Sequence, residues 1–205
     1  MNKKKGLFIS FEGPEASGKS SQILLLQKYL TTKKISFITT REPGGTKLAE
    51  SLRNLILKIK SDINIDEEIL MLMASRSHHI NNVIKPALDK GILVISDRFA
   101  DSTFVYQGYV NNFGIQKAKS LHKNILNNFL PHKTFLFNLS SSKIIARLKK
   151  RKSKNKYDKL ERNFHDQVNK GYELISKNKR FIKIDASKSI TSINKKIINA
   201  INLLI

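Results

Sequence analysis

The sequence contains no cysteine among its 205 residues, which excludes disulfide bonds and thiolate metal sites. Its five histidines offer no plausible ligand spacing, because the adjacent His78 and His79 would leave a helix in different directions. No apolar run approaches the roughly 18 residues that span a bilayer, and the lysine-rich start leads into a predicted strand rather than a signal-peptide core. We therefore expect one cytoplasmic domain over residues 1–205, without a membrane partner.

Acidic residues are also scarce, since 16 of them stand against 38 basic residues and leave a net charge of +22. Such an excess suggests nucleic-acid binding, or at least an attraction for anions. Most of the basic residues, however, are lysines spread along a chain rich in asparagine and isoleucine, as AT-rich coding would produce. We interpret most of the charge as a solvated surface and expect no stable nucleic-acid partner.

Arginine is rare, so the positions of the eight arginines carry information. Arg41, Arg53, Arg76 and Arg98 all lie in the half of the chain that carries the motifs below. Where lysine is the default cation, arginine is the residue that a bidentate phosphate or base contact requires. Arg76 lies among apolar residues of a predicted helix, so it needs an anionic or carbonyl partner if it faces inward.

The strongest motif is a phosphate-binding loop at residues 13–20, which fits G-x-x-x-x-G-K-[ST]. It follows an apolar strand-like run and precedes a leucine-rich helical pattern, which is the context such a loop needs. Lys19 is expected to reach the β- and γ-phosphates of a nucleotide, and Ser20 to offer its hydroxyl to Mg²⁺. The predicted nucleotide-binding residues are Gly13, Pro14, Glu15, Ala16, Ser17, Gly18, Lys19 and Ser20.

A second motif follows the continuous apolar run of residues 92–96, which is typical of a central parallel strand. The run ends in Asp97 and Arg98, and ligands bind at the carboxyl ends of such strands. We expect Asp97 to hold Mg²⁺ or its waters, and Arg98 to bind a second phosphate. Further along, Thr103, Tyr106 and Gln107 share one helix face through their i, i+3 and i+4 spacing.

The overall pattern alternates strands with helices, which predicts a three-layer α/β domain with a five-stranded parallel sheet. The predicted strands cover residues 7–11, 36–40, 92–96, 134–139 and 181–185. A long helical pattern over residues 66–90 contains Pro86, which we expect to bend or end the helix. The basic segment at about residues 149–157 follows the fourth strand and its helix, where small-molecule kinases carry a mobile lid.

Three stretches together resemble the bacterial thymidylate kinases with a basic lid. They are Thr-Arg-Glu-Pro-Gly-Gly-Thr at residues 40–46, Ser-Asp-Arg-Phe at 96–99 and Ser-Thr-Phe-Val-Tyr-Gln-Gly at 102–108. The resemblance covers nearly the whole chain. It implies a P-loop NTPase fold with strand order 2-3-1-4-5, a homodimer, and transfer of the γ-phosphoryl group of Mg·ATP to dTMP, a step toward dTTP.

The resemblance also implies individual roles. Arg53 and Arg98 match positions that hold the acceptor phosphate, Arg76 and Thr103 match positions that bind thymine, and Tyr106 matches the ring beneath the deoxyribose. Arg147 and Ala186 match the adenine side. The implied catalytic residues are Glu15, Lys19, Asp97, Arg98 and Arg151. The implied substrate-binding residues are Glu42, Pro43, Arg53, Leu72, Arg76, Arg98, Thr103, Tyr106 and Gln107, and the metal-binding residues are Ser20 and Asp97.

The chain departs from the family pattern in three places. Leu72 occupies the position where a phenylalanine usually stacks on thymine, so the base platform is either this leucine or Met73. Phe99 replaces the usual tyrosine or histidine. Ala16 resembles the subgroup whose phosphate loop lacks an arginine, which leaves the catalytic cation to the lid, where Arg151 is the one arginine of residues 149–154.

Alternative functions are another P-loop nucleotide or nucleoside kinase, or a basic nucleic-acid-binding protein. The second alternative leaves the turn at residues 41–46 and the placement of Asp97 unexplained. A GTPase is also suggested by Asn-Lys-Tyr-Asp at residues 155–158, which matches N-K-x-D. That motif should follow a buried strand, whereas this copy lies in the charged segment, so we reject it.

Overall fold

A computed structural model describes residues 5–58, 63–150 and 161–205. Its centre is a five-stranded, fully parallel sheet in the order β2-β3-β1-β4-β5, which confirms the predicted fold class and strand order. The strands are β1 (Phe8–Glu12), β2 (Phe37–Arg41), β3 (Leu93–Asp97), β4 (Lys133–Asn138) and β5 (Phe181–Asp185). The three central strands are apolar and buried on both faces, as expected for strands covered by helices on both sides.

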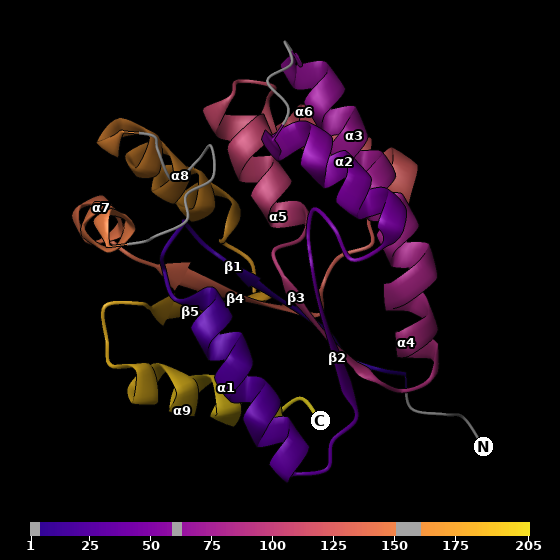
Figure 1. The fold of residues 1–205 in the computed structure, drawn as a ribbon, viewed down its shortest axis with the longest axis vertical. Coiled ribbons are helices and arrows are strands. Elements are labelled where there is room, and N and C mark those ends of the chain that lie inside the picture. Colours follow the sequence, from indigo (N-terminus) through magenta and orange to yellow (C-terminus); the bar gives the residue numbers. More distant parts are fainter. Residues whose placement is uncertain (1–4, 59–62, 151–160) are drawn as a thin grey trace.

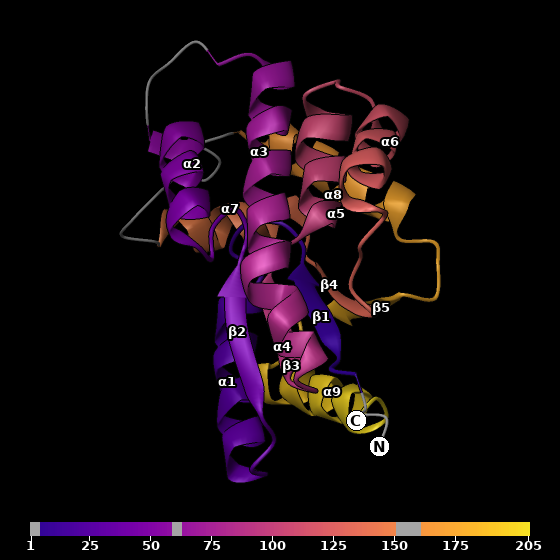
Figure 2. The ribbon, with the colours of Figure 1, turned by 90° about the vertical axis from the view of Figure 1, so that its right-hand side faces the viewer.

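Helices cover both faces of this sheet, as the two perpendicular views show (Figure 1, Figure 2). One face is covered by α1 (Lys19–Thr32), α7 (Ser141–Lys149) and α9 (Ile190–Asn202). The other face carries α3 (Ile65–His79), α4 (Lys85–Asp89), α5 (Ala100–Thr103), α6 (Ile115–Leu126) and α8 (Arg162–Ile175). The remaining helix, α2 (Lys47–Lys58), packs against α3. None of the helices in the described ranges is long and apolar enough to cross a membrane.

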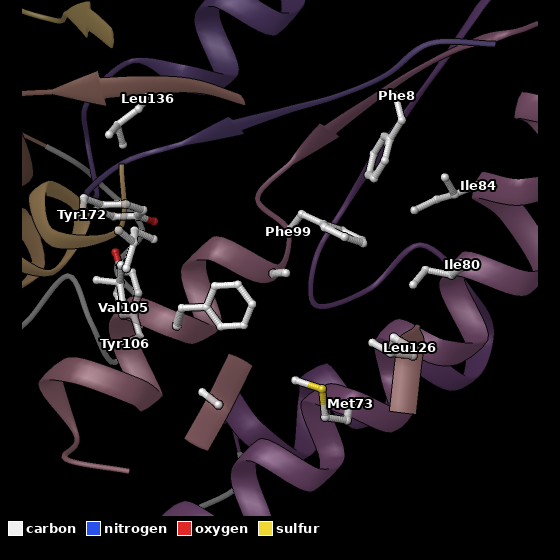
Figure 3. Packing of buried hydrophobic residues seen from close by; sticks show 14 of the residues in the cluster. Phe8, Met73, Ile80, Ile84, Phe99, Val105, Tyr106, Leu126, Leu136 and Tyr172 are labelled. Carbon is white, nitrogen blue, oxygen red and sulfur yellow. The ribbon is translucent and has the colours of Figure 1, made fainter. Parts of the chain in front are cut away.

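The two apolar cores follow from the two-residue period of a strand. In β1, Phe8 enters the core beneath α3 and α6, whereas Ile9 and Phe11 enter the core beneath α1 and α9. Figure 3 shows the first core, in which Phe8 meets Phe99 with ring centroids 4.9 Å apart and perpendicular planes. This packing anchors the segment just after β3, where the second sequence motif lies.

The long helix predicted over residues 66–90 is continuous, but it changes its winding twice. It begins as α3, widens into the π-helical turn η1 (Ile80–Ile84), and returns to α-helix in α4. Pro86 therefore does not end the helix, which continues to Asp89; it lies directly after the π-helical turn, a change of winding of the kind that distorts a helix locally. A second π-helical segment, η2 (Phe104–Val110), extends α5 beside the cleft described below.

Strand register brings the two motifs together at one edge of the sheet. Phe11 pairs with Asp97, and Arg41 pairs with Asp97 from the other side. The carboxyl ends of β1, β2 and β3 therefore lie next to one another, and each continues directly into a loop that carries charged residues.

Candidate active site

A cleft of about 510 Å³ opens at this edge of the sheet. It collects most of the predicted site residues: Glu15, Ala16, Ser17, Gly18, Lys19, Ser20, Glu42, Pro43, Arg53, Leu72, Arg76, Asp97, Arg98, Thr103, Tyr106 and Gln107. Predicted residues that do not line it are Gly13, Pro14, Arg147 and Ala186. Residues that line it without having been predicted are Ser21, Arg41, Ile56, Leu57, Phe99 and Ser102. Arg151 and most of the predicted lid lie outside the described residues.

The phosphate-binding loop owes its shape to two glycines. Gly13 has a φ of +135°, and a β-carbon there would lie 2.5 Å from the carbonyl oxygen of Phe137, so no side chain fits. Gly18, with a φ of +97°, is the N-cap of α1 and directs the first turn of that helix at the loop. The loop is thus arranged as an anion site at a helix N-terminus.

Lys19 folds back onto this loop. Its ammonium group donates to the carbonyl oxygens of Gly13 at 3.0 Å and Pro14 at 2.8 Å, and to Ser17 Oγ at 3.3 Å. Burial lowers the pKa of Lys19, and together with the nearby positive charge of Arg98 it brings the value to about 8 although the carboxylates of Asp97, Glu15 and Glu12 oppose the shift. The lysine is therefore a buried cation whose hydrogen bonds, among the described residues, go to acceptors of its own loop.

Ser20 and Asp97 meet across the cleft, as predicted from two separate motifs. Ser20 Oγ donates a hydrogen bond of 3.0 Å to Asp97 Oδ2. Within the described ranges, no cluster of three or more histidine, cysteine or carboxylate residues could hold a metal ion by itself. One carboxylate with one hydroxyl suits Mg²⁺, because that ion keeps several waters and takes its other ligands from substrate phosphates.

Arg98 is the centre of a polar cluster in the cleft. Its guanidinium donates to Glu15 Oε1 at 2.9 Å, to Ser102 Oγ at 3.0 Å and to the Tyr172 hydroxyl at 3.2 Å. It also lies 5.1 Å from the centre of the Tyr106 ring. Its φ of +70° is unusual for a residue other than glycine, and such strain is found mostly at functional sites.

Tyr106 completes this cluster through Glu15. Burial raises the pKa of Tyr106 well above its usual value, so the phenol stays protonated and donates to both carboxylate oxygens of Glu15, at 2.8 and 2.9 Å. The position of the Glu15 carboxylate is thus fixed by a phenol and by the guanidinium of Arg98. Figure 3 shows Tyr106 and Tyr172 side by side where η2 meets α8.

Sequence reasoning missed Glu12, the last residue of β1. The side chain is fully buried and accepts hydrogen bonds from the Phe99 N–H at 2.7 Å, from Ser102 at 2.6 Å and from Tyr172 at 2.8 Å. Burial raises the pKa of Glu12 to about 7, and the nearby Asp101 carboxylate adds to the rise. A carboxylate at the carboxyl end of an otherwise apolar strand was the signal that could have identified it.

Arg53 and the loop after β2 form the neighbouring wall. Arg53 Nη1 donates to the carbonyl oxygen of Pro43 at 2.8 Å, which places the half-buried guanidinium beside Arg98 in the cleft. Burial lowers the pKa of Arg53, and the positive charge of Arg41 acts in the same direction. A cation placed among other cations at a cleft favours an anionic ligand there.

Arg76 has the anionic partner that the sequence required. Its Nε donates to Glu42 Oε2 at 2.6 Å, and its Nη2 donates to Thr103 Oγ1 at 2.8 Å. Only 2% of the residue is exposed, yet Nη1 has no hydrogen-bond partner among the described residues. Burial alone would raise the pKa of Glu42, but Arg76 and a hydrogen bond from His79 lower it, so the pair is ionic. The unpaired donor belongs to a side chain that lines the cleft.

The structure separates the two candidates for the base platform. Leu72 lines the cleft, whereas Met73 is 1% exposed and lies in the apolar core beneath it (Figure 3). Of the two residues, Leu72 is therefore the one that can contact a ligand in the cleft. Gln107 lines the same part of the cleft, and its amide donates to Glu68 Oε1 at 2.7 Å.

Arg147 and Ala186 lie together at the other end of the phosphate loop. Arg147 donates through Nη1 to the Ala16 carbonyl oxygen and through Nη2 to the Ala186 carbonyl oxygen, both at 3.1 Å. Its guanidinium therefore bridges the phosphate loop and the turn after β5. This places both residues next to the nucleotide-binding loop but outside the main cleft.

Comparisons with known proteins agree with this geometry. The family model described as "Thymidylate kinase" matches residues 11–197. The chain is 42% identical to the thymidylate kinase of Mycoplasma capricolum subsp. capricolum over 200 residues, which cover 95% of this chain and 94% of the relative. It is 40% identical to the thymidylate kinase of Carboxydothermus hydrogenoformans, in an alignment that covers 90% of this chain and 91% of the relative. It is 39% identical to the thymidylate kinase of Francisella tularensis subsp. tularensis, in an alignment that covers 93% of this chain and 92% of the relative. The chain therefore belongs to the thymidylate kinase family, the enzymes that phosphorylate dTMP to dTDP.

Proposed function

We propose that the chain transfers the γ-phosphoryl group of ATP to the 5′-phosphate of dTMP in this cleft, with Mg²⁺ as the metal ion. The observation that carries the proposal is that one cleft is lined by the phosphate loop, by Arg53 and Arg98, and by Arg76 and Thr103. A donor triphosphate and an acceptor monophosphate need such an arrangement, because the reaction depends on in-line positioning more than on covalent chemistry.

On the donor side, we assign the polyphosphate to the backbone N–H groups of the loop and to Lys19. Arg147 and Ala186 would border the adenine, since they meet at the end of the loop away from the main cleft. Ser20 and Asp97 would hold Mg²⁺, because their oxygens already lie 3.0 Å apart and are hard donors. When bound, the ion would neutralise charge on the phosphates.

On the acceptor side, we assign the 5′-phosphate to Arg53 and Arg98. Both guanidiniums line the cleft and can bind phosphate oxygens bidentately. Glu15, held by Tyr106, would face the deoxyribose, and Tyr106 would lie beneath the sugar ring. Glu42 and Pro43 would shape the wall beside the acceptor, with Glu42 acting through Arg76 and Pro43 through Arg53.

The base would occupy the end of the cleft lined by Leu72, Arg76, Thr103 and Gln107. The buried Nη1 of Arg76 supports this assignment, because a buried donor without a partner is costly and a base carbonyl would satisfy it. Thymine and uracil carry a carbonyl at position 4, whereas cytosine carries an amino group there. The same donor therefore favours dTMP over dCMP.

Two further parts of the proposal concern the lid and the assembly. Arg151 remains our candidate for the cation that meets the transferring phosphoryl group, although it lies outside the described residues. We also propose a cytoplasmic homodimer that associates through α3. Leu70 on this helix is 54% exposed and would be covered by the second subunit.

A coupled assay of ADP formation tests the proposal with dTMP, dUMP, dCMP and thymidine as acceptors. We expect the highest kcat/KM with dTMP, a low value with dCMP, and no turnover with thymidine, which offers no phosphate to Arg53 and Arg98. Arg53→Gln should raise the KM for dTMP, whereas Arg162→Gln, at an exposed arginine of α8, serves as the matched control. Equal use of thymidine and dTMP would instead indicate a nucleoside kinase.

A further inference from the structure

Two adjacent histidines at the end of α3 hold opposite ends of the loop that follows β2. The nitrogens of the His79 ring lie 3.0 Å from Glu42 Oε1 and 2.6 Å from Thr40 Oγ1. His78 turns the other way, and its Nδ1 lies 3.0 Å from Thr46 Oγ1. Because the two side chains leave the helix in different directions, they were not expected to share a metal ion. The same difference in direction lets them contact two separate points of one loop.

Glu42 connects the first of these histidines with Arg76. Its Oε1 meets His79 Nδ1, and its Oε2 meets Arg76 Nε at 2.6 Å. Arg76 and His79 are three residues apart on α3, so they share one helix face and approach the carboxylate from the same side. The side chains of all three are at most 3% exposed, which makes this a dry cluster in which hydrogen-bond geometry is strict.

The hydrogen-bonding roles in this cluster follow from the acceptor-only character of a carboxylate. Because Glu42 is ionic, Nδ1 of His79 must carry the proton and donate it to Oε1. In a neutral ring Nε2 then accepts from the Thr40 hydroxyl. A directed chain results, in which Thr40 on β2 orients His79, His79 orients Glu42, and Glu42 orients Arg76, which donates on to Thr103.

The loop is packed directly onto the imidazole ring, which leaves His79 little freedom to move. Gly45 has a φ of +88°, and a β-carbon there would lie 2.6 Å from both His79 Nε2 and Thr40 Oγ1. A side chain at Gly45 would therefore displace the ring. Gly45 is therefore required by its contact with His79 as well as by the conformation of the turn.

We propose that His79 is a positioning residue for base recognition, acting through Glu42 on the guanidinium of Arg76. The inference rests on the proposed function, in which Nη1 of Arg76 meets the base carbonyl. Two of the three nitrogens of Arg76 are fixed by Glu42 and Thr103, and their direction determines where Nη1 points. Without His79, the carboxylate loses the donor that fixes one of its oxygens and can rotate, and the angle of Arg76 changes with it.

Three substitutions of His79 test this chain of contacts. His79→Asn keeps a donor at the place of Nδ1, facing Glu42, whereas His79→Gln offers a polar group only at the place of Nε2, facing Thr40. His79→Ala removes both. The matched control is His78→Ala, which loses a contact to the far end of the same loop but none to Glu42. For each protein we would measure kcat, the KM for dTMP, the KM for ATP, the ratio of kcat/KM for dTMP over dCMP, and the melting temperature.

We expect His79→Ala and His79→Gln to raise the KM for dTMP and to lower the dTMP-over-dCMP ratio by about tenfold each, the loss expected when a charge-assisted hydrogen bond is misplaced. The KM for ATP should change little, because among the described residues the side-chain hydrogen bonds of this cluster go to Thr40 and Thr103 and to one another, and none goes to the phosphate loop. His79→Asn should recover most of the selectivity, and His78→Ala should retain it. If His79→Ala does not fold, the dTMP-over-dCMP ratios of His79→Asn and His79→Gln still test the inference. A higher ratio in His79→Asn supports it, and equal ratios contradict it.

Two results would overturn the inference in distinguishable ways. If all three variants lower only the melting temperature or affect dTMP and dCMP equally, while Arg76→Lys does lower selectivity, His79 is a structural residue and the proposed function stands. If Arg76→Lys leaves the dTMP-over-dCMP ratio unchanged in an active enzyme, the assignment of the base site itself is wrong, and the role of His79 is lost with it.

Discussion

The buried carboxyl group of Glu12 should make the stability of this protein fall as the pH rises toward neutrality. Its pKa is about 7 in the folded protein, against a usual value of 4.5 for a glutamate exposed to water. Between these two values the folded protein keeps a proton that the unfolded chain has already released. The contribution of Glu12 to stability therefore declines as the pH increases through this window, and its full loss is present above about pH 7. Glu12→Gln mimics the protonated form and should remove the effect.

The magnitude follows from the two pKa values. A tenfold difference in proton affinity corresponds to about 1.4 kcal/mol, so Glu12 lowers the free energy of unfolding at pH 7.5 by about 3 kcal/mol. Of this, about 2 kcal/mol develops between pH 5 and pH 7.5. Glutamine can still accept from the Phe99 N–H and can donate to the hydroxyl oxygens of Ser102 and Tyr172, so the neutral network is kept.

Urea unfolding at pH 5 and pH 7.5 would measure this effect as the difference between the variant and the wild type. The difference is needed because His122 acts in the opposite direction: burial lowers the pKa of His122 to about 4, which makes stability rise between about pH 4 and 6.5 in both proteins. Relative to the wild type, Glu12→Gln should gain about 2 kcal/mol on going from pH 5 to pH 7.5. Glu173→Gln, at an exposed position of α8, is the matched control. A gain below about 0.5 kcal/mol, or one of opposite sign, would refute the reasoning.

Three further substitutions probe the cleft itself. Lys19→Ala should lower kcat by at least about 100-fold, as expected for loss of a group that binds developing phosphate charge, while the melting temperature stays equal or rises because a buried cation with a lowered pKa costs stability. Near-normal turnover in a folded protein would remove Lys19 from the mechanism. Arg98→Lys should lower kcat/KM for dTMP by about 10- to 100-fold, since an ammonium group cannot make the bidentate contact, and unchanged kinetics would place the acceptor phosphate elsewhere. Leu72→Phe should lower the Kd of dTMP by about 2- to 10-fold through ring stacking, whereas weaker binding in calorimetry would mean that the leucine already fills the space beside the base.

Much of the fold and of the site followed from the sequence, because these features depend on local patterns. The glycines and lysine of residues 13–20 and the apolar run ending at Asp97 place their residues at known points of an α/β sheet. The apolar neighbours of Arg76 in the sequence predicted that its side chain needs an anionic or carbonyl partner if it faces inward. Glu42 is that partner in the structure. Which of Leu72 and Met73 lines the cleft did not follow, because adjacent helix residues point to different sides and the packing of the whole domain determines which side is buried.

The contacts that escaped prediction join parts of the chain with no shared pattern. Tyr172 reaches Arg98 across 74 residues, and Glu12 accepts from Tyr172 across 160 residues. His79 meets Glu42 from a separate element. The pKa of Glu12 depends on burial by helices that are distant in sequence, so composition and spacing contain no measure of it. Such groups become visible only when the packing around them is known.

The contacts of Lys19 would make the proposed binding of phosphate an exchange of hydrogen bonds rather than a simple addition. An ammonium group has three N–H donors, and this chain supplies three acceptors to them from the residues at positions 13, 14 and 17. Any phosphate that reaches the lysine must replace at least one of these partners, so the gain is the difference between two sets of hydrogen bonds. For a single small anion this difference contributes little binding free energy. A polyphosphate that also accepts hydrogen bonds from the backbone N–H groups of the loop would bind more tightly. The acceptors of the loop therefore compete with the ligand for the ammonium group of Lys19. Only a ligand with enough negative charge, and enough length to reach the backbone donors as well, would replace them.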